Sequence, residues 1–113
     1  MAESERRKEE KRRAELLDRL IVAICADYER RRAEIEEGTV SPRVKMEYKY
    51  MNSRVFDAAG EISGGALAEI FINEIGNGTG YSHSKASGIS ESAYKIYKKE
   101  IKSNIARKLS LKD

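Results

Sequence analysis

The first third of the chain carries apolar residues at the spacing of an α-helix. No residue between Ser4 and Glu37 breaks a helix; Ser4 is a suitable N-cap and Gly38 a suitable end. Residues 5–13 contain no apolar side chain and are expected to fray as an isolated helix. Further along, apolar positions recur every three or four residues, at Leu17, Ile21, Ile24 and Tyr28. The pattern predicts one long amphipathic helix within residues 1–37.

The apolar stripe of this helix has two interpretations. It either packs into the core of its own chain or forms a short dimerising coiled coil. The argument for the coiled coil is that the chain offers few other elements to cover the stripe, although Arg31 at a seam position limits its length. Leu16, Leu20 and Cys25 broaden the stripe. In the second interpretation residues 1–37 are a dimerisation arm with the interface residues Leu17, Ile21, Ile24 and Tyr28.

A second helix is predicted after the connection at Gly38. Ser41 is a good N-cap, and Pro42 suits the first helical position because its missing N–H is not needed there. The apolar positions that follow keep helical spacing, at Val44, Tyr48, Met51, Val55 and Ala59. Gly60 and then the Gly64–Gly65 pair are expected to interrupt this helix.

Two more helices are predicted in the rest of the chain. Residues 66–75 are apolar on most faces, which places them at the centre of the core, and Gly76 is expected to end this helix. A turn-rich loop follows at residues 76–82. Residues 90–109 are amphipathic, with a core face at Tyr94, Tyr97, Ile101, Ile105 and Leu109. The sequence thus predicts an all-α fold in which residues 38–113 form a helical domain.

The composition fits one highly charged helical protein. Its 113 residues are 40% hydrophobic and 36% charged, which suits helices with solvated faces. No apolar run approaches the roughly 20 residues that span a bilayer. The charged N-terminus is not followed by the apolar segment of a signal peptide. We therefore expect a soluble, cytoplasmic protein with no membrane partner.

Basic charge is concentrated at the C-terminal end. Residues 1–37 carry 10 basic and 11 acidic side chains and residues 38–84 carry 4 and 5, whereas residues 85–113 carry 8 and 3. A polyanionic partner is therefore expected at the last quarter of the chain. Lysines that merely solubilise an exposed helix would give the same distribution.

Catalytic and metal-binding groups are sparse. One histidine and one cysteine exclude the usual structural zinc sets and an intramolecular disulfide. His83 lies alone in a polar loop, and Cys25 falls on an apolar helix face, where a free thiol behaves as a small hydrophobe. Glu69 and Glu74 are expected to face solvent or to pair with a lysine. We expect no catalytic residue, no metal and no cofactor, and the protein is not expected to be an enzyme.

Residues 76–80 are rich in glycine, as phosphate-binding loops are. Such a loop follows a strand, opens a helix and carries Lys-Ser/Thr or a ribose-binding acid. This segment follows a predicted helix and lacks those partners, which favours a hinge between two helices.

The most informative constellation is a helix-turn-helix-like segment at residues 82–109. Gly88 is placed for the turn, Ile89 for the junction and Ser90 for the N-cap of a recognition helix. Serine and lysine on the outward face suit base edges and phosphates. The predicted nucleic-acid-binding residues are Lys85, Ser90, Glu91, Ser92, Lys95, Lys98, Lys99, Lys102 and Arg107.

Residues 88–94, followed by Ile101, Ile105 and residues 107–109, resemble the turn and recognition helix of region-four-type sigma-factor and LuxR-like domains. A helical bundle that ends in such a segment is similar to small phage transcriptional activators of the ArpU and RinA kind. The departure from that pattern lies before Gly88, where the support helix would carry serines and a histidine instead of an apolar pair. A plain amphipathic helix is the alternative.

The first functional hypothesis is therefore a DNA-binding transcriptional regulator of phage or mobile-element origin. It would bind double-stranded DNA as a homodimer, with its C-terminal helix in the major groove, and its N-terminal helix could also hold a host protein partner. The alternative is a small helical protein–protein interaction module, such as a phage-encoded inhibitor of a host nucleic-acid enzyme.

Overall fold

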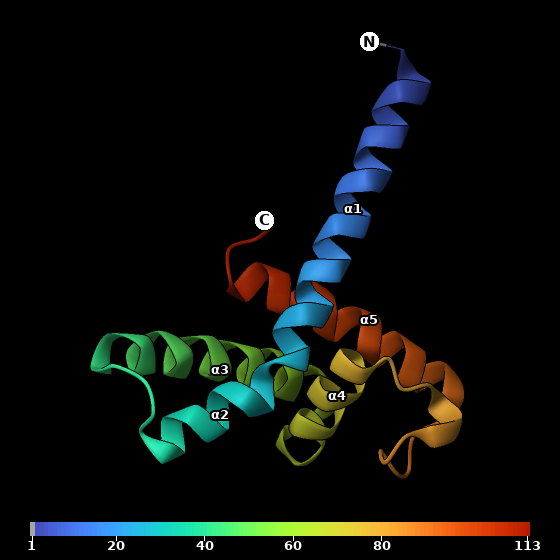
Figure 1. The fold of residues 1–113 in the computed structure, drawn as a ribbon. Coiled ribbons are helices and arrows are strands. Elements are labelled where there is room, and N and C mark those ends of the chain that lie inside the picture. Colours follow the sequence, from blue (N-terminus) through green and yellow to red (C-terminus); the bar gives the residue numbers. More distant parts are fainter. Residues whose placement is uncertain (1) are drawn as a thin grey trace.

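The structure, a computed structural model, describes residues 2–113, and within them it is all-α as predicted (Figure 1). Most of the predicted helices are present with similar bounds. In chain order the elements are α1 (Glu3–Ala26), α2 (Tyr28–Glu37), α3 (Pro42–Ser63), α4 (Gly65–Asn77), the single 3-10 turn η1 (Tyr81–His83) and α5 (Glu91–Lys108).

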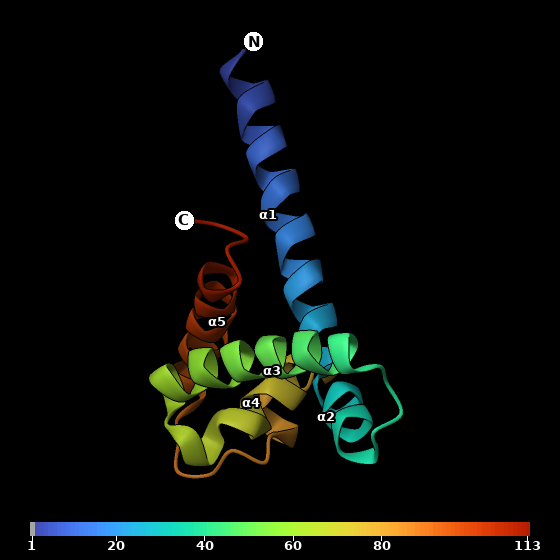
Figure 2. The same ribbon diagram turned by 90° about the vertical axis from the view of Figure 1, so that its left-hand side faces the viewer.

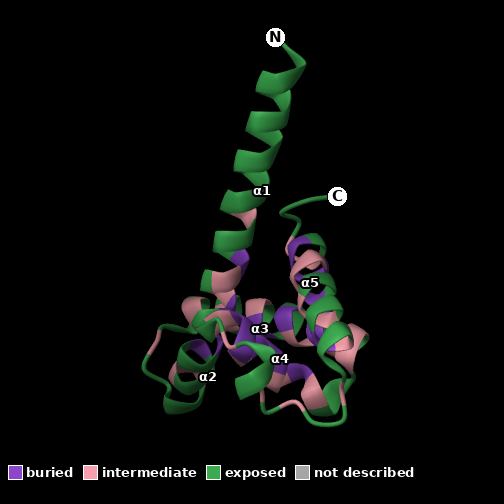
Figure 3. Ribbon diagram, turned by 90° about the vertical axis from the view of Figure 1, so that its right-hand side faces the viewer, coloured by how far each residue is buried: buried purple, intermediate pink, exposed green. Residues whose placement is uncertain are grey.

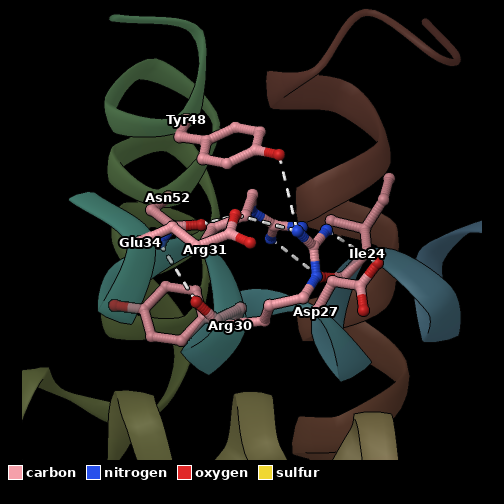
Figure 4. Close-up of polar contacts among 8 residues, drawn as sticks. Ile24, Asp27, Arg30, Arg31, Glu34, Tyr48 and Asn52 are labelled. Atoms are coloured by element: carbon pink, nitrogen blue, oxygen red, sulfur yellow. Dashed lines mark hydrogen bonds and ion pairs between the residues drawn. The ribbon is translucent and has the colours of Figure 1, made fainter. Parts of the chain in front are cut away.

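The long N-terminal helix is bent, which the sequence did not indicate. Asp27 leaves the helical conformation and separates α1 from α2. The bend frees the Ile24 carbonyl, which accepts a hydrogen bond of 2.8 Å from the buried Arg31 guanidinium. Arg31 Nε also donates to Asn52 Oδ1 of α3 at 2.6 Å, as Figure 4 shows. Arg31 is thus a bridge between the bend and α3, not a seam residue of a coiled coil.

The N-terminal half of α1 stands away from the rest of the molecule. Residues 2–16 are all exposed, and Figures 1 and 3 show them as a helical arm above the other helices. Only from Leu17 onward does α1 contribute side chains to the core. We call residues 2–16 the arm.

The core forms around α4, as its apolar sequence predicts. Ala68, Phe71 and Ile72 are fully buried, α3 and α1 lie against this helix, and the Phe71 ring contacts Tyr94 of α5. Figure 2 shows α3 lying across α4 and α2, with α5 beside them. The predicted core face of α5 is confirmed, since Tyr94, Ile101 and Ile105 are buried and Tyr97 and Leu109 pack against them.

Two glycines lie inside helices that they were expected to end. Gly76 is within α4, which continues to Asn77 and ends at Gly78 in the left-handed conformation (φ 69°). A Cβ at Gly76 would lie 2.6 Å from the Ala26 backbone, so this glycine lets α4 approach α1 closely. Gly60 is likewise inside α3, which ends three residues later at Ser63.

The start of α3 follows the sequence prediction. Ser41 Oγ accepts a hydrogen bond from the Val44 amide, and Pro42 occupies the first turn. At the preceding helix end, Gly38 adopts the left-handed conformation (φ 68°). Both boundary signals therefore act as expected.

The predicted dimer interface on α1 is wrong in its central residues. Ile21 and Tyr28 are buried within the chain itself, and Leu17 and Ile24 are half-buried against the same core. The physical reason is that α4 and α5 cover this side of α1. The stripe left exposed lies further round the helix, at Leu16 and Leu20.

Candidate nucleic-acid interface

Helix α5 is held firmly on the core and presents its other side to solvent. Its N-cap is Ser90, as predicted, whose Oγ accepts from the Ala93 amide at 3.2 Å. Its core face packs against α3 and α1, and the ring of Tyr94 also meets Phe71 of α4, with the ring centroids 5.3 Å apart. We call the exposed residues on its opposite side, Ser92, Lys95, Ile96, Lys99 and Glu100, the outer face of α5.

The support helix of a helix-turn-helix does not form before Gly88. Only the single turn η1 is present, and residues 84–90 are non-helical. The polar residues of this segment supply too little apolar surface to hold a helix against the core. The helix that precedes α5 in the fold is therefore α4, separated from it by residues 78–90.

A buried carboxylate takes over the positioning role of the missing helix. Glu74 of α4 is 6% exposed and accepts hydrogen bonds from Ser84 Oγ (2.6 Å), the Lys85 amide (2.7 Å) and the Tyr94 hydroxyl (2.7 Å). Burial opposes its ionisation, but these hydrogen bonds together with the charge of Lys98 outweigh it, so the pKa of Glu74 is lowered. Glu74 thus ties the 78–90 connection to both α4 and α5.

This role of Glu74 could not be predicted from the sequence. A carboxylate in an apolar helix was expected to face solvent or to pair with a lysine. The serine-rich segment 82–87, whose one apolar residue is Ala86, was the only available signal that hydrogen bonds more than packing would hold the connection. Glu69 on the same helix does form an ion pair, with Arg32.

Two of the predicted nucleic-acid-binding lysines are used inside the chain. Lys98 Nζ donates to the Thr79 carbonyl at 2.7 Å and lies 5.2 Å from the centre of the Tyr94 ring. Burial and, to a lesser extent, the charge of Lys102 lower the pKa of Lys98. Lys102 Nζ forms a 2.7 Å ion pair with Asp18 of α1. Both lysines therefore hold helices and loops together instead of standing free.

The remaining predicted residues are accessible. Lys85, Lys95, Lys99 and Arg107 are exposed, as are Ser90, Glu91 and Ser92 at the start of α5. Of these, Lys95 lies 3.4 Å from the Glu91 carboxylate and Arg107 donates to Asn104 Oδ1 at 3.2 Å. The Lys95–Glu91 pair lies at the surface, and Arg107 is itself exposed, so both cations remain open to an external anion.

The glycine segment 76–80 is not an anion cradle, since its first two residues belong to α4 and the rest form the connection that follows it. Its Thr79 amide is already bonded to the Glu74 carbonyl at 3.0 Å, and the Thr79 carbonyl accepts from Lys98. The hinge interpretation of the sequence matches this geometry better than a phosphate-binding loop.

Within residues 2–113, no three histidine, cysteine or acidic side chains gather as a metal site would require. His83 is exposed on η1. The thiol of Cys25 is 1% exposed, and burial raises its pKa to about 12. A thiol in that setting is not a nucleophile at neutral pH.

We expect Cys25 to resist thiol reagents in the folded protein. At pH 8 the native chain should react at least about 100-fold more slowly with a chromogenic disulfide reagent than the chain unfolded in guanidinium, because the thiolate is suppressed and covered. Stopped-flow absorbance measures both rates. Comparable rates would contradict the burial of Cys25 between α1 and α4.

Comparison with protein-family models, with characterised proteins and with solved structures found no match. None of the helices in the described residues combines the length and the apolar character needed to cross a bilayer.

Proposed function

We propose that this protein binds duplex DNA through the outer face of α5 and acts as a transcriptional regulator of phage or mobile-element origin. The observation that carries the proposal is a firmly seated helix whose exposed side bears Lys95 and Lys99, in the one part of the chain with a strong basic excess. Lys85 lies just before this helix and Arg107 near its end. These four cations would bind phosphates.

We expect the residues on and beside α5 to contact two different parts of the DNA. Lysines and arginine fix a protein on the DNA backbone, whereas short polar side chains at the start of a recognition helix read base edges. Ser92 and Glu91 occupy that position on α5. Helix α3, together with Glu74 of α4, would brace α5 in place of the expected support helix. Lys98 and Lys102 would contribute through the fold only.

The direct test is fluorescence anisotropy with labelled mixed-sequence duplexes at low and moderate salt. We expect binding at low salt that weakens steeply as salt rises, because each phosphate engaged releases a counterion. The slope of affinity against salt concentration reports the number of phosphates. Absence of binding even at low salt would reject the proposal.

Charge reversal of Lys95 and Lys99 together should lower DNA affinity at least about 10-fold and reduce the salt slope. Both side chains are exposed, so circular dichroism of the variant should match that of the wild type. The matched control is K45E/K49E on α3, which makes the same change in net charge at the same spacing. Equal losses in both variants would show a general charge effect instead of a binding face.

A protein partner is the second candidate function, of the kind a phage-encoded inhibitor of a host nucleic-acid enzyme would have. The observation that favours it is an exposed apolar surface between α1, α3 and the C-terminal tail. Surfaces of this kind are uncommon on proteins that act alone. If the protein does not bind DNA even at low salt, this apolar surface favours the second candidate function.

A further inference from the structure

An apolar groove runs between α1, the start of α3 and the C-terminal tail. Its volume is about 720 Å³, and all but one of its lining residues are apolar: Leu20, Ile24, Met46, Glu47, Tyr50, Met51, Leu109 and Leu111. Met46 is 73% exposed and Tyr50 57% exposed. Burial of such surface is favourable at about 25 cal/mol per Å², so the groove is suited to binding another apolar surface.

A ridge continues from one wall of this groove. Leu16 and Leu20 lie one turn apart on α1 and are 55% and 45% exposed. Leu20 belongs to the groove wall, whereas Leu16 lies beyond the groove where α1 becomes the projecting arm. The molecule therefore carries an apolar ridge and an apolar groove side by side.

We propose that a second copy of this chain occupies the groove, in a two-fold dimer that pairs the α1 helices antiparallel. In a two-fold contact the same surface must supply both the projecting and the receiving part. The neighbouring ridge and groove meet that requirement, because Leu16 of each copy can enter the groove of the other. This interface replaces the one predicted on Ile21 and Tyr28.

The charges of the arm fit a protein surface of mixed charge. Residues 3–15 carry six basic and five acidic side chains, interleaved along the sequence. In an antiparallel dimer centred on Leu16 and Leu20 the arm of each copy points along the body of the other, and its nearly balanced charge does not repel that surface strongly. A surface built to follow a phosphate backbone would carry one sign of charge.

The size of the surface also favours a partner that covers the arm. The eight groove residues fall short of the roughly 20–30 residues that each partner contributes to a stable interface. Adding the exposed arm, residues 2–16, reaches that range. The arm also lacks neighbours in its own chain, and an isolated helix with so few apolar residues is only marginally stable in water.

The test is the mass in solution of the full chain from about 1 to 100 μM, measured by sedimentation equilibrium. We expect a dimer, with twice the chain mass of 12.8 kDa. The double variant L16E/L20E should weaken the dimer roughly 100-fold, because each new carboxylate would be buried without a partner. Circular dichroism should remain unchanged, since both side chains are exposed in the single chain.

Two further variants keep the test decisive. Met46→Glu changes the opposite wall of the groove, on α3, and should also weaken the dimer. It tests the same interface if L16E/L20E fails to fold. Ile96→Glu places a carboxylate at a similarly exposed apolar residue of α5 and should leave the dimer intact. A monomeric wild type, a larger assembly, or dimers unaffected by L16E/L20E and Met46→Glu would overturn the proposal. The outcome does not depend on DNA binding.

Discussion

Replacing Gly76 by alanine is expected to destabilise the fold by about 3 kcal/mol, the largest loss that one added methyl group should cause in this chain. The new Cβ would lie 2.6 Å from both Cα and N of Ala26. These are backbone atoms, so no side-chain rotation relieves the clash, and α4 and α1 must separate instead. Thermal unfolding should show the change as a fall in Tm of roughly 10 °C.

The matched control is Gly65→Ala in the first turn of the same helix. A Cβ there meets nothing within 4 Å, and alanine is the better helix former, so Tm should stay the same or rise slightly. If Gly76→Ala were as stable as Gly65→Ala, the close approach of α4 to the end of α1 would be wrong.

The helices could be predicted from the sequence because their signals are local. Hydrophobic spacing, the N-caps at Ser41 and Ser90 and the stop at Gly38 each depend on a few neighbouring residues. Gly76 is a position at which the neighbouring sequence does not predict the structure. A glycine within an apolar run has the same sequence signature whether it ends a helix or admits another backbone, and only the position of α1 distinguishes the two.

Which side of a helix is covered also depends on packing that the sequence does not encode locally. The spacing correctly marked one apolar stripe on α1, but it could not say whether the chain itself or a second copy covers Ile21. The bend at Asp27 was missed for a related reason. It is stabilised by Arg31 and Asn52, which are 21 residues apart in the sequence.

The candidate site was predicted in part. The start of α5 and the exposure of Lys95 and Lys99 follow from the N-cap and the amphipathic spacing. The internal roles of Lys98 and Lys102 do not, because their partners, the Thr79 carbonyl and Asp18, are distant in sequence. A count of basic residues therefore overestimates how many are free to bind a phosphate.

Replacing Glu74 by glutamine is expected to cost about 2–3 kcal/mol at pH 7. Three donors converge on this carboxylate, from Ser84, Lys85 and Tyr94. Glutamine keeps the size but has one acceptor oxygen and an NH₂ group, so at least one donor would face another donor. The connection that leads into α5 would loosen, and chemical denaturation would measure the loss.

The pH dependence of that loss identifies the charge of Glu74 as its cause. Because the folded state holds the pKa of this carboxyl below its ordinary value, its contribution is complete above about pH 4.3, the pKa of an unfolded glutamate. It declines as the pH falls through the lower pKa of the folded state. The difference in unfolding free energy between wild type and E74Q should therefore shrink in acid.

Glu69→Gln on the same helix is the control for E74Q, since it mainly alters an exposed ion pair with Arg32 and should cost less than about 1 kcal/mol. Loss of the Glu74 interactions should also act on α5, because Tyr94 is one of the three donors. E74Q should then weaken the DNA binding that we propose for α5, without changing any exposed cation. A variant as stable as wild type from pH 3 to 7 would show that Glu74 does not hold this connection.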